Sequence, residues 1–194
     1  MKLALTGGIG CGKSTVLEFF KESDWRTIDS DTIVRELLAE NAKVQALLFD
    51  RWGKSVFAQD ALVDRKALAV RVFSDPQALR WLEEILHPLV QQRWKSLIAT
   101  ASKSHWIIEV PLLFEKSLET SFDSTICVYC TLPLVESRMT LRGFSRTELL
   151  NRRKQQTPLK EKIDRADFII SNVGTLDFSK RQTLKLIQQL FALN

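Results

Sequence analysis

The stretch Gly7-Gly8-Ile9-Gly10-Cys11-Gly12-Lys13-Ser14-Thr15 decides the fold class of this chain. It fits the pattern G-x-x-x-x-G-K-S/T, which is typical of loops that bind the phosphates of a nucleoside triphosphate. The apolar segment 2–6 comes directly before it, and the apolar segment 16–20 follows its last residue. The sequence therefore predicts a phosphate loop between a buried strand and a helix, which is the context that such a loop needs.

Each residue type in the loop suits a phosphate ligand. Glycines let the backbone turn tightly and point its N–H groups at phosphate oxygens, and the positive end of the next helix favours the same anion. Lys13 can reach the β- and γ-phosphates, and the Ser14 hydroxyl can coordinate Mg²⁺. A glycine-rich turn without a ligand would leave both residues unexplained. The predicted nucleotide-binding residues of the loop are Gly8, Gly10, Cys11, Gly12, Lys13, Ser14 and Thr15.

The composition limits the class of protein. The 194 residues are 45% hydrophobic and 26% charged, which suits one globular domain with a small inserted subdomain. No stretch of about 18 apolar residues occurs, so we expect no membrane span, and segment 2–6 is interpreted as a core strand instead of a secretory signal. We expect a cytoplasmic protein that is a monomer or a weak homo-oligomer. Three cysteines do not make a disulfide framework. Cys127 and Cys130 lie in an apolar strand, so we expect buried thiols instead of a redox or metal pair, and Cys11 belongs to the phosphate loop.

The net charge of +5 is concentrated in one segment. Between Arg138 and Arg165, nine basic and three acidic residues give +6, so the rest of the chain carries −1. A concentrated basic patch indicates an anionic partner, which is either a nucleic acid or a polyphosphate held by arginines. The phosphate loop favours the polyphosphate, and we expect no nucleic-acid partner.

Short apolar segments alternate with longer helical patterns along the chain. Their near-continuous hydrophobicity is typical of a parallel sheet covered on both faces, and the alternation predicts a three-layer α/β/α fold with five parallel strands. The predicted strands are Lys2–Thr6, Thr27–Asp29, Trp106–Val110, Thr125–Cys130 and Phe168–Ser171.

Two helical regions interrupt this alternation. About 75 residues separate the second strand from the third, which is too long for a simple crossover and predicts a helical insertion that binds the second substrate. A basic helical hairpin after the fourth strand predicts a lid. The expected division is a core of 1–30, 104–135 and 166–194, an insertion of about 31–103 and a lid of about 136–165.

Capping residues and prolines give the helix boundaries. The predicted helices start after Asp64, at Asp75-Pro76, at Pro88 (to about Thr100), at Pro133 (through Arg142), after a capping box at Ser145, and at about Phe178 (to Leu193).

Carboxylates follow two of the strands, where ligands of open α/β sheets bind. Asp31 comes just after the second strand and could deprotonate an acceptor hydroxyl or hold the metal through water, although it could also cap the next helix. For Asp29, a structural role as a helix cap and a functional role are equally open. Glu109 ends the third strand as a second acid near Mg²⁺ or as a solvated charge. His105 is expected to be structural, and for His87 both interpretations stay open.

Arginines of the basic segment can clamp transferring phosphates. Arg138 and Arg142 are four residues apart and share a helix face, and Arg152 and Arg153 could act in the same way. We expect a solvated basic surface for Arg146, Lys154, Lys160 and Lys162.

Over nearly its full length, the chain resembles the dephospho-CoA kinase family. The first motif by itself indicates only a nucleotide kinase, but the ordered combination with His-Pro and Pro-Leu-Leu-Phe-Glu is specific. The matching residues are 5–15, 28–31 with Arg35, Leu86-His87-Pro88-Leu89, 110–115, Arg138, Arg142, Ser145, Arg152, Gln156 and 166–174.

The resemblance implies a P-loop kinase with a core, a helical CoA domain and a lid. It implies transfer of the ATP γ-phosphoryl group to the 3′-hydroxyl of 3′-dephospho-CoA with Mg²⁺. It also implies that Asp31 is the base, that Thr6 lies near the reacting groups and that Arg142 meets the ATP phosphates. The residues expected to line the acceptor pocket are Asp31, Arg35, His87, Pro88, Leu112 and Glu115.

Other functions remain as alternatives. A nucleoside or nucleotide kinase would share the loop and lid but would not need the His-Pro and Pro-Leu-Leu-Phe-Glu motifs. A regulatory GTPase would carry an N-K-x-D motif, which does not occur. A nucleic-acid-dependent NTPase or a nucleotide-binding module without catalysis would also contain the phosphate loop.

Overall fold

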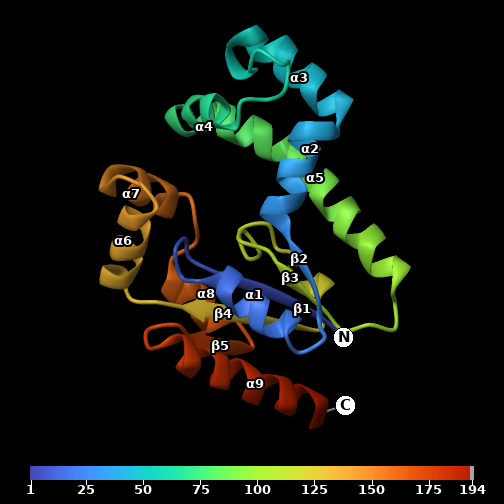
Figure 1. Cartoon of the computed structure of the whole chain (residues 1–194), viewed down its shortest axis with the longest axis vertical. Coiled ribbons are helices and arrows are strands. Elements are labelled where there is room, and N and C mark those ends of the chain that lie inside the picture. Colours follow the sequence, from blue (N-terminus) through green and yellow to red (C-terminus); the bar gives the residue numbers. More distant parts are fainter. Residues whose placement is uncertain (193–194) are drawn as a thin grey trace. The chain divides into compact units, whose positions relative to one another are not determined.

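A computed structural model gives the structure of the chain and describes residues 1–192. The chain divides into two compact units (Figure 1). One unit combines Met1–Asp29 with the described residues from Ser102 onward, and the other is Ser30–Ala101.

A parallel sheet of five strands forms the centre of the first unit. The strand order is β2-β3-β1-β4-β5, and each neighbouring pair runs parallel. This order places the strand before the phosphate loop in the middle of the sheet. The predicted fold class is confirmed, and every predicted strand is correct to within one residue. The strands are β1 Lys2–Gly7, β2 Arg26–Asp29, β3 Trp106–Glu109, β4 Ser124–Tyr129 and β5 Phe168–Ser171.

Helices cover both faces of this sheet. Leu3 and Leu5 of β1 share a core with Phe20 of α1, and α1 also packs against α9. Thr6 and Cys127, which pair in register, point to the opposite face, where α8 packs on β1 and β4. The helices of this unit are α1 Lys13–Lys21, α6 Leu132–Leu141, α7 Arg146–Lys154, α8 Leu159–Arg165 and α9 Leu176–Ala192, with the short 3₁₀ helix η2 Glu119–Ser121.

The second unit is helical and has its own apolar core. Val44, Leu48 and Leu68 are almost fully buried in that core. Asn41, Asp64 and Asp75 each accept a hydrogen bond from a backbone N–H of the helix that follows, which satisfies donors that a helix start leaves open. The caps predicted at Asp64 and Asp75 are therefore confirmed. The helices are α2 Ser30–Glu40, α3 Ala42–Trp52, η1 Gly53–Val56, α4 Arg65–Ser74 and α5 Pro76–Thr100.

The predicted helix start at Pro88 is wrong, because α5 continues through this residue. Proline lacks the N–H that would bond to the carbonyl four residues earlier, so it usually breaks or bends a helix. Here the turns on both sides bury one continuous stripe, and the packing of that stripe keeps the helix in one piece. The buried residues of the stripe are Leu82, Leu86, Val90 and Trp94.

The remaining helix predictions have mixed outcomes. The capping box at Ser145 is confirmed, and the glycine that follows α6, Gly143, has a φ of 83°. Helix α8 was not predicted. Helix α9 begins two residues before the predicted start, and its predicted end at Leu193 lies outside the described residues. Within residues 1–192, no helix is long and apolar enough to cross a membrane.

The packing of α1 on the sheet predicts the effect of one core substitution. Phe20 is fully buried and meets the ring of Trp25 edge to face at a centroid distance of 5.3 Å. We expect Phe20→Ala to lower the free energy of unfolding by about 3–5 kcal/mol, measured by denaturant titration. The control Leu141→Ala removes a side chain that is 87% exposed, and we expect a change within about 0.5 kcal/mol. Equal losses in both variants would contradict this packing.

Candidate active site

The phosphate loop lies at the carboxyl end of the central strand β1 and leads into α1. Gly8, Gly10, Cys11 and Gly12 form the turn, and Cys11 N–H donates to the Gly8 carbonyl at 3.3 Å. Lys13, Ser14 and Thr15 form the first turn of α1. The sheet order changes direction at β1, which is where ligands bind in open α/β sheets.

Asn172, just after β5, fixes the shape of this loop. Its Nδ2 donates to the Cys11 carbonyl at 2.9 Å, and its Oδ1 accepts from the Ser179 hydroxyl at 2.9 Å. A Cβ atom on Gly12 would lie 2.0 Å from this Nδ2, and Gly12 has a φ of +89°. Only glycine fits at position 12. No role for Asn172 was predicted from the sequence. A polar residue at the carboxyl end of a predicted strand was the available signal.

Lys13 is buried against the loop and forms an ion pair. Its Nζ lies 3.7 Å from Glu109 Oε1 and donates to the Gly8 carbonyl at 3.3 Å. Both side chains are nearly enclosed, with Lys13 9% and Glu109 7% exposed. The interpretation of Glu109 as a solvated strand-end charge is therefore wrong. When no phosphate is bound, the Glu109 carboxylate compensates the positive charge of Lys13.

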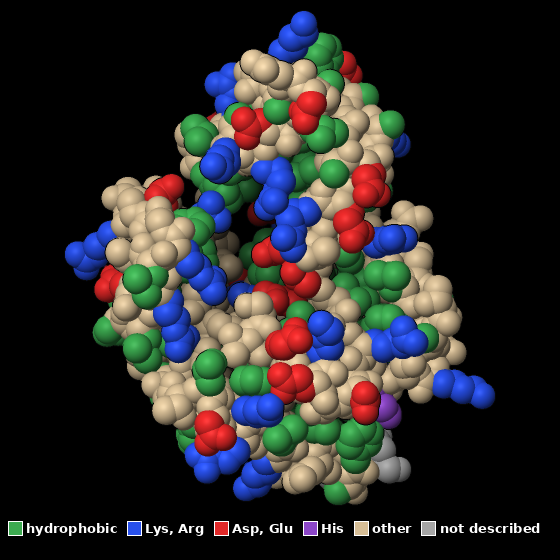
Figure 2. Space-filling view, viewed as in Figure 1, with side chains coloured by type: hydrophobic (Ala, Val, Ile, Leu, Met, Phe, Trp, Pro, Cys, Tyr) green, Lys and Arg blue, Asp and Glu red, His purple; other side chains and the backbone are tan. Residues whose placement is uncertain are grey.

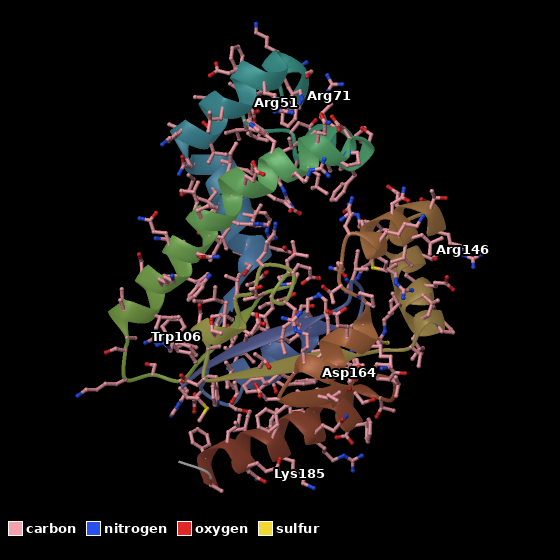
Figure 3. All side chains as sticks on the ribbon, turned by 180° about the vertical axis from the view of Figure 1, so that it is seen from behind. Arg51, Arg71, Trp106, Arg146, Asp164 and Lys185 are labelled. Atoms are coloured by element: carbon pink, nitrogen blue, oxygen red, sulfur yellow. The ribbon has the colours of Figure 1, made fainter. Side chains whose placement is uncertain are left out.

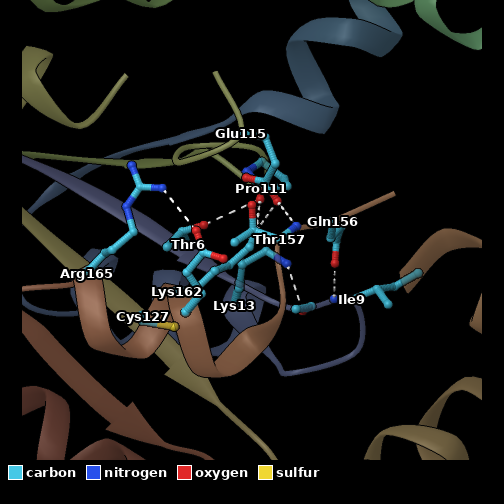
Figure 4. A network of polar contacts seen from close by, with 12 residues as sticks. Thr6, Ile9, Lys13, Pro111, Glu115, Cys127, Gln156, Thr157, Lys162 and Arg165 are labelled. Carbon is cyan, nitrogen blue, oxygen red and sulfur yellow. Dashed lines mark hydrogen bonds and ion pairs between the residues drawn. The ribbon is translucent and has the colours of Figure 1, made fainter. Parts of the chain in front are cut away.

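A second buried ion pair lies next to the loop (Figure 4). Lys162 of α8 has no exposed surface, and its Nζ lies 2.8 Å from Glu115 Oε1 and donates to the Pro111 carbonyl at 2.7 Å. Thr6 is also fully buried, and its hydroxyl donates to the same carbonyl at 3.4 Å. The predicted solvated surface position of Lys162 is thus wrong, because α8 packs this side chain against the sheet.

The surroundings of Lys162 act on its charge. Burial lowers the pKa of the Lys162 ammonium, the hydrogen bond and the charge of Glu115 oppose this lowering, and the charge of Lys13 adds to it. Burial disfavours the charged form unless partners compensate for the lost water. For Lys162, the Glu115 carboxylate and the Pro111 carbonyl compensate for this lost water.

Two residues after α7 connect the basic segment to the loop. Gln156 Oε1 accepts from the N–H of Ile9 at 3.0 Å, and Glu115 Oε1 accepts from the N–H of Thr157 at 2.7 Å. Gln156 matched the family resemblance but received no role from the sequence analysis. Its side chain occupies a backbone N–H of the phosphate loop in this structure.

A small pocket of about 70 Å³ opens between the loop and the basic segment. Polar and apolar side chains share its lining, and Arg153 is its one arginine. The lining residues are Gly8, Ile9, Cys11, Cys130, Leu132, Val135, Arg153, Gln156, Thr157, Pro158 and Leu159.

The arginines of the basic segment differ in their contacts. Arg138 donates to the Asn172 carbonyl at 3.2 Å and to Cys130 Sγ at 3.4 Å, which places it at the loop. Arg142 directly follows α6 and is exposed. The guanidinium of Arg152 lies 4.8 Å from the centroid of the Phe144 ring. Lys and Arg side chains are visible over α6 and α7 in Figure 2.

The remaining basic residues of this segment match the prediction of a solvated surface. The side chains of Arg146 and Lys160 are 80% and 88% exposed, and Lys154 is exposed as well. Arg146 projects outward from α7 (Figure 3).

All three cysteines are buried free thiols, which confirms the prediction for Cys127 and Cys130. Burial raises the pKa of Cys11 and raises that of Cys127 to about 12. Both thiols are therefore protonated at neutral pH and are poor nucleophiles. His105 packs on the rings of Trp25 and Phe191 at 5.1 and 4.9 Å, which confirms its predicted structural role.

Several predicted acceptor residues belong to the second unit. Asp31 is the second residue of α2 and lies in the first turn of that helix. Arg35 donates to the Thr32 hydroxyl one turn away on the same helix. His87 and Pro88 lie on α5, which packs against α2. The other predicted acceptor residues, Leu112 and Glu115, follow β3 in the first unit.

Comparison with known proteins identifies the family. The family model for dephospho-CoA kinase matches residues 1–177. A dephospho-CoA kinase from Aquifex aeolicus is 33% identical over 190 residues, which covers 97% of each chain. The chain belongs to the dephospho-CoA kinase family.

Solved structures agree with this membership. The protein TT1252 from Thermus thermophilus superimposes with a TM-score of 0.81 at 32% identity, covering 98% of this chain and 97% of that one. The dephospho-CoA kinase from Campylobacter jejuni gives a TM-score of 0.70 at 27% identity and covers 98% of both chains. The fold that these proteins share thus covers 98% of this chain.

The overlap between Asn172 and any side chain at position 12 predicts the effect of a substitution of Gly12. We expect Gly12→Ala to raise the Kd for ATP by more than about tenfold, because the loop must move to relieve the overlap. Calorimetric titration with ATP measures this change. Gly53→Ala is the matched control, since Gly53 also has a positive φ of 57° but no atom within 4 Å of the added Cβ. An unchanged Kd in Gly12→Ala would contradict the proposed packing of the loop.

Proposed function

We propose that the chain transfers the γ-phosphoryl group of ATP to the 3′-hydroxyl of 3′-dephospho-CoA and releases CoA and ADP. The observation that carries this proposal is the phosphate loop with Lys13 held beside Glu109 at 3.7 Å. Membership of the dephospho-CoA kinase family supports this acceptor. The same membership makes the chain an ATP-dependent transferase of coenzyme A biosynthesis.

On the donor side, the loop binds the phosphates of ATP. Backbone N–H groups at the end of the loop and in the first turn of α1, together with the positive end of the α1 dipole, attract the β- and γ-phosphates. Lys13 turns from Glu109 to the phosphates when they bind. Arg138 and Arg142 meet charge on the transferring group, as arginines do in phosphoryl transfer. Arg138 already contacts the strand ends beside the loop.

On the acceptor side, a carboxylate accepts the proton of the attacking hydroxyl. We assign this role to Asp31 in the first turn of α2, since a positioned carboxylate is a common general base for such a step. Thr6, on β1, lies near the reacting groups in this proposal, and its hydroxyl donates to the Pro111 carbonyl. The residues proposed to line the acceptor pocket are Asp31, Arg35, His87, Pro88, Leu112 and Glu115.

The residues present suit Mg²⁺ as the metal partner of ATP. Among residues 1–192, no three His, Cys, Asp or Glu side chains form a metal-binding group. Mg²⁺ usually takes one or two protein ligands together with water and substrate phosphates. The exposed Ser14 hydroxyl in the first turn of α1 would hold it. When bound, the metal neutralises phosphate charge.

Residues 136–165, which contain the basic segment, act as a lid in this proposal. The contacts of Gln156 with Ile9 and of Thr157 with Glu115 tie its end to the site. A closed lid excludes water, which would otherwise accept the phosphoryl group. The cytoplasmic location, the monomeric or weakly associated state and the absence of a nucleic-acid partner stay predictions.

The function is tested directly with the three components. Incubation of the chain with ATP, Mg²⁺ and dephospho-CoA is expected to give CoA and ADP, detected by mass spectrometry. A panel of nucleosides and nucleotides serves as the alternative acceptors. Phosphorylation of a nucleoside with no product from dephospho-CoA would contradict the proposal.

The role of Asp31 predicts a large loss of turnover in one variant. We expect Asp31→Asn to lower kcat by roughly 10²–10⁴-fold, as for a lost general base. Asp50→Asn, an exposed aspartate of α3 in the same unit, is the control and should keep the wild-type kcat. Steady-state kinetics with saturating ATP make the comparison. A nearly normal kcat in Asp31→Asn would remove this residue from the mechanism.

The role of Lys13 predicts a loss on the donor side. Lys13→Ala removes the positive charge at the phosphates, so we expect kcat/KM for ATP to fall by at least about 10²-fold. Lys21→Ala, at the exposed end of the same helix, is the control and should change it little. Full activity of Lys13→Ala with ATP would show that the loop has been assigned wrongly.

A further inference from the structure

The side chain of Lys162 is fully buried, so it cannot act as a solvated surface charge. Among the residues that the structure describes, it is the one charged side chain with no exposed surface at all. Taking an ammonium group out of water is costly unless close acceptors compensate. Both of its acceptors lie in one short segment, Pro111–Glu115, directly after β3 and Val110.

The two contacts hold both ends of that segment. Lys162 Nζ reaches the carbonyl of Pro111 at 2.7 Å and the carboxylate of Glu115 at 2.8 Å. Charge-assisted hydrogen bonds of this length are among the stronger ones in proteins. The residue therefore fixes the segment with one group, and α8 carries that group.

The same segment connects to the strand and loop of the donor site. The hydroxyl of Thr6, one residue before the phosphate loop, reaches the Pro111 carbonyl at 3.4 Å. The much shorter bond from Lys162 makes the ammonium the main donor to this oxygen. Glu109, two residues before the segment, forms the ion pair with Lys13.

A further chain of contacts returns to the loop through the end of the basic segment. Glu115 Oε1 accepts from the N–H of Thr157 as well as from Lys162, and the neighbouring Gln156 accepts from the N–H of Ile9. Lys162 thus completes a closed set of contacts between the phosphate loop and the segment after β3 (Figure 4).

We infer that Lys162 is a positioning residue for phosphoryl transfer: its ammonium holds Pro111–Glu115 at a fixed place beside the phosphate loop. This inference rests on the proposed function, because the acceptor roles of Leu112 and Glu115 belong to that proposal. Lys162 is fully enclosed, so it acts through these residues and does not touch the substrate itself. Misplacement of a positioned group by about 1 Å can cost roughly 10²-fold in rate.

The test compares two lysines of the same short helix. Lys162→Met removes the buried ammonium, and Lys160→Met removes one whose side chain is 88% exposed and pairs with Asp164. For Lys162→Met we expect kcat/KM for dephospho-CoA to fall roughly 10²-fold while the Kd for ATP, measured by calorimetry, changes little. Lys160→Met should match the wild type in both measurements.

The split between these two measurements separates positioning from a purely structural role. A structural role would lower the melting temperature and leave the kinetics of the folded enzyme unchanged. Wild-type values of kcat and KM in Lys162→Met, measured well below its melting temperature, would overturn the inference. A wild type that makes no CoA would overturn the proposed function instead.

A second variant covers the case in which Lys162→Met does not fold, since it leaves Glu115 buried without its cation. The pair Glu115→Gln/Lys162→Met leaves no charge at either position and is compared with Glu115→Gln alone. Because Lys162 also holds the Pro111 carbonyl, we expect the pair to have kcat/KM for dephospho-CoA roughly tenfold below the single variant. Equal values would overturn the inference, since Lys162 would then serve only as the counter-ion of Glu115.

Discussion

The candidate site depends on keeping two ammonium groups out of water beside a phosphate loop. Lys13 and Lys162 are both buried, and each has a glutamate within 4 Å, Glu109 for the first and Glu115 for the second. A buried cation without such a partner would destabilise the fold or lose its proton. Both glutamates come from β3 and the few residues after it, so this part of the chain supplies the anionic partner of each buried lysine.

The phosphate loop is shaped by a neutral side chain as well as by charge. Asn172 holds the Cys11 carbonyl and fills the space where any side chain at residue 12 would lie. Arg138 binds the carbonyl of the same asparagine. The ends of β1, β4 and β5 are therefore joined by hydrogen bonds around the loop, which hold its backbone in place before a ligand arrives. Such preorganisation lowers the cost of binding an anion.

The basic segment serves two different purposes in one stretch of sequence. Its exposed residues, such as Arg146 and Lys160, remain in solvent, where they form ion pairs with Glu136 and Asp164. Its end, from Gln156 to Lys162, is instead tied to the phosphate loop and to the segment after β3. In the proposed function, these contacts anchor the lid beside the phosphate loop.

The sequence by itself determined the phosphate loop, the five strands and most helix starts, because these depend on residues a few positions apart. Caps such as Asp64 and Ser145 bond to the next turn, and the loop glycines belong to a local pattern. Only the tertiary structure decided the burial of Lys162, the role of Asn172 and the continuity of α5 through Pro88. Each depends on contacts between distant segments. The spacing of Leu159, Lys162 and Ile163 suits one face of a helix, but a lysine on such a face is buried only if another segment supplies acceptors, here residues 111 and 115.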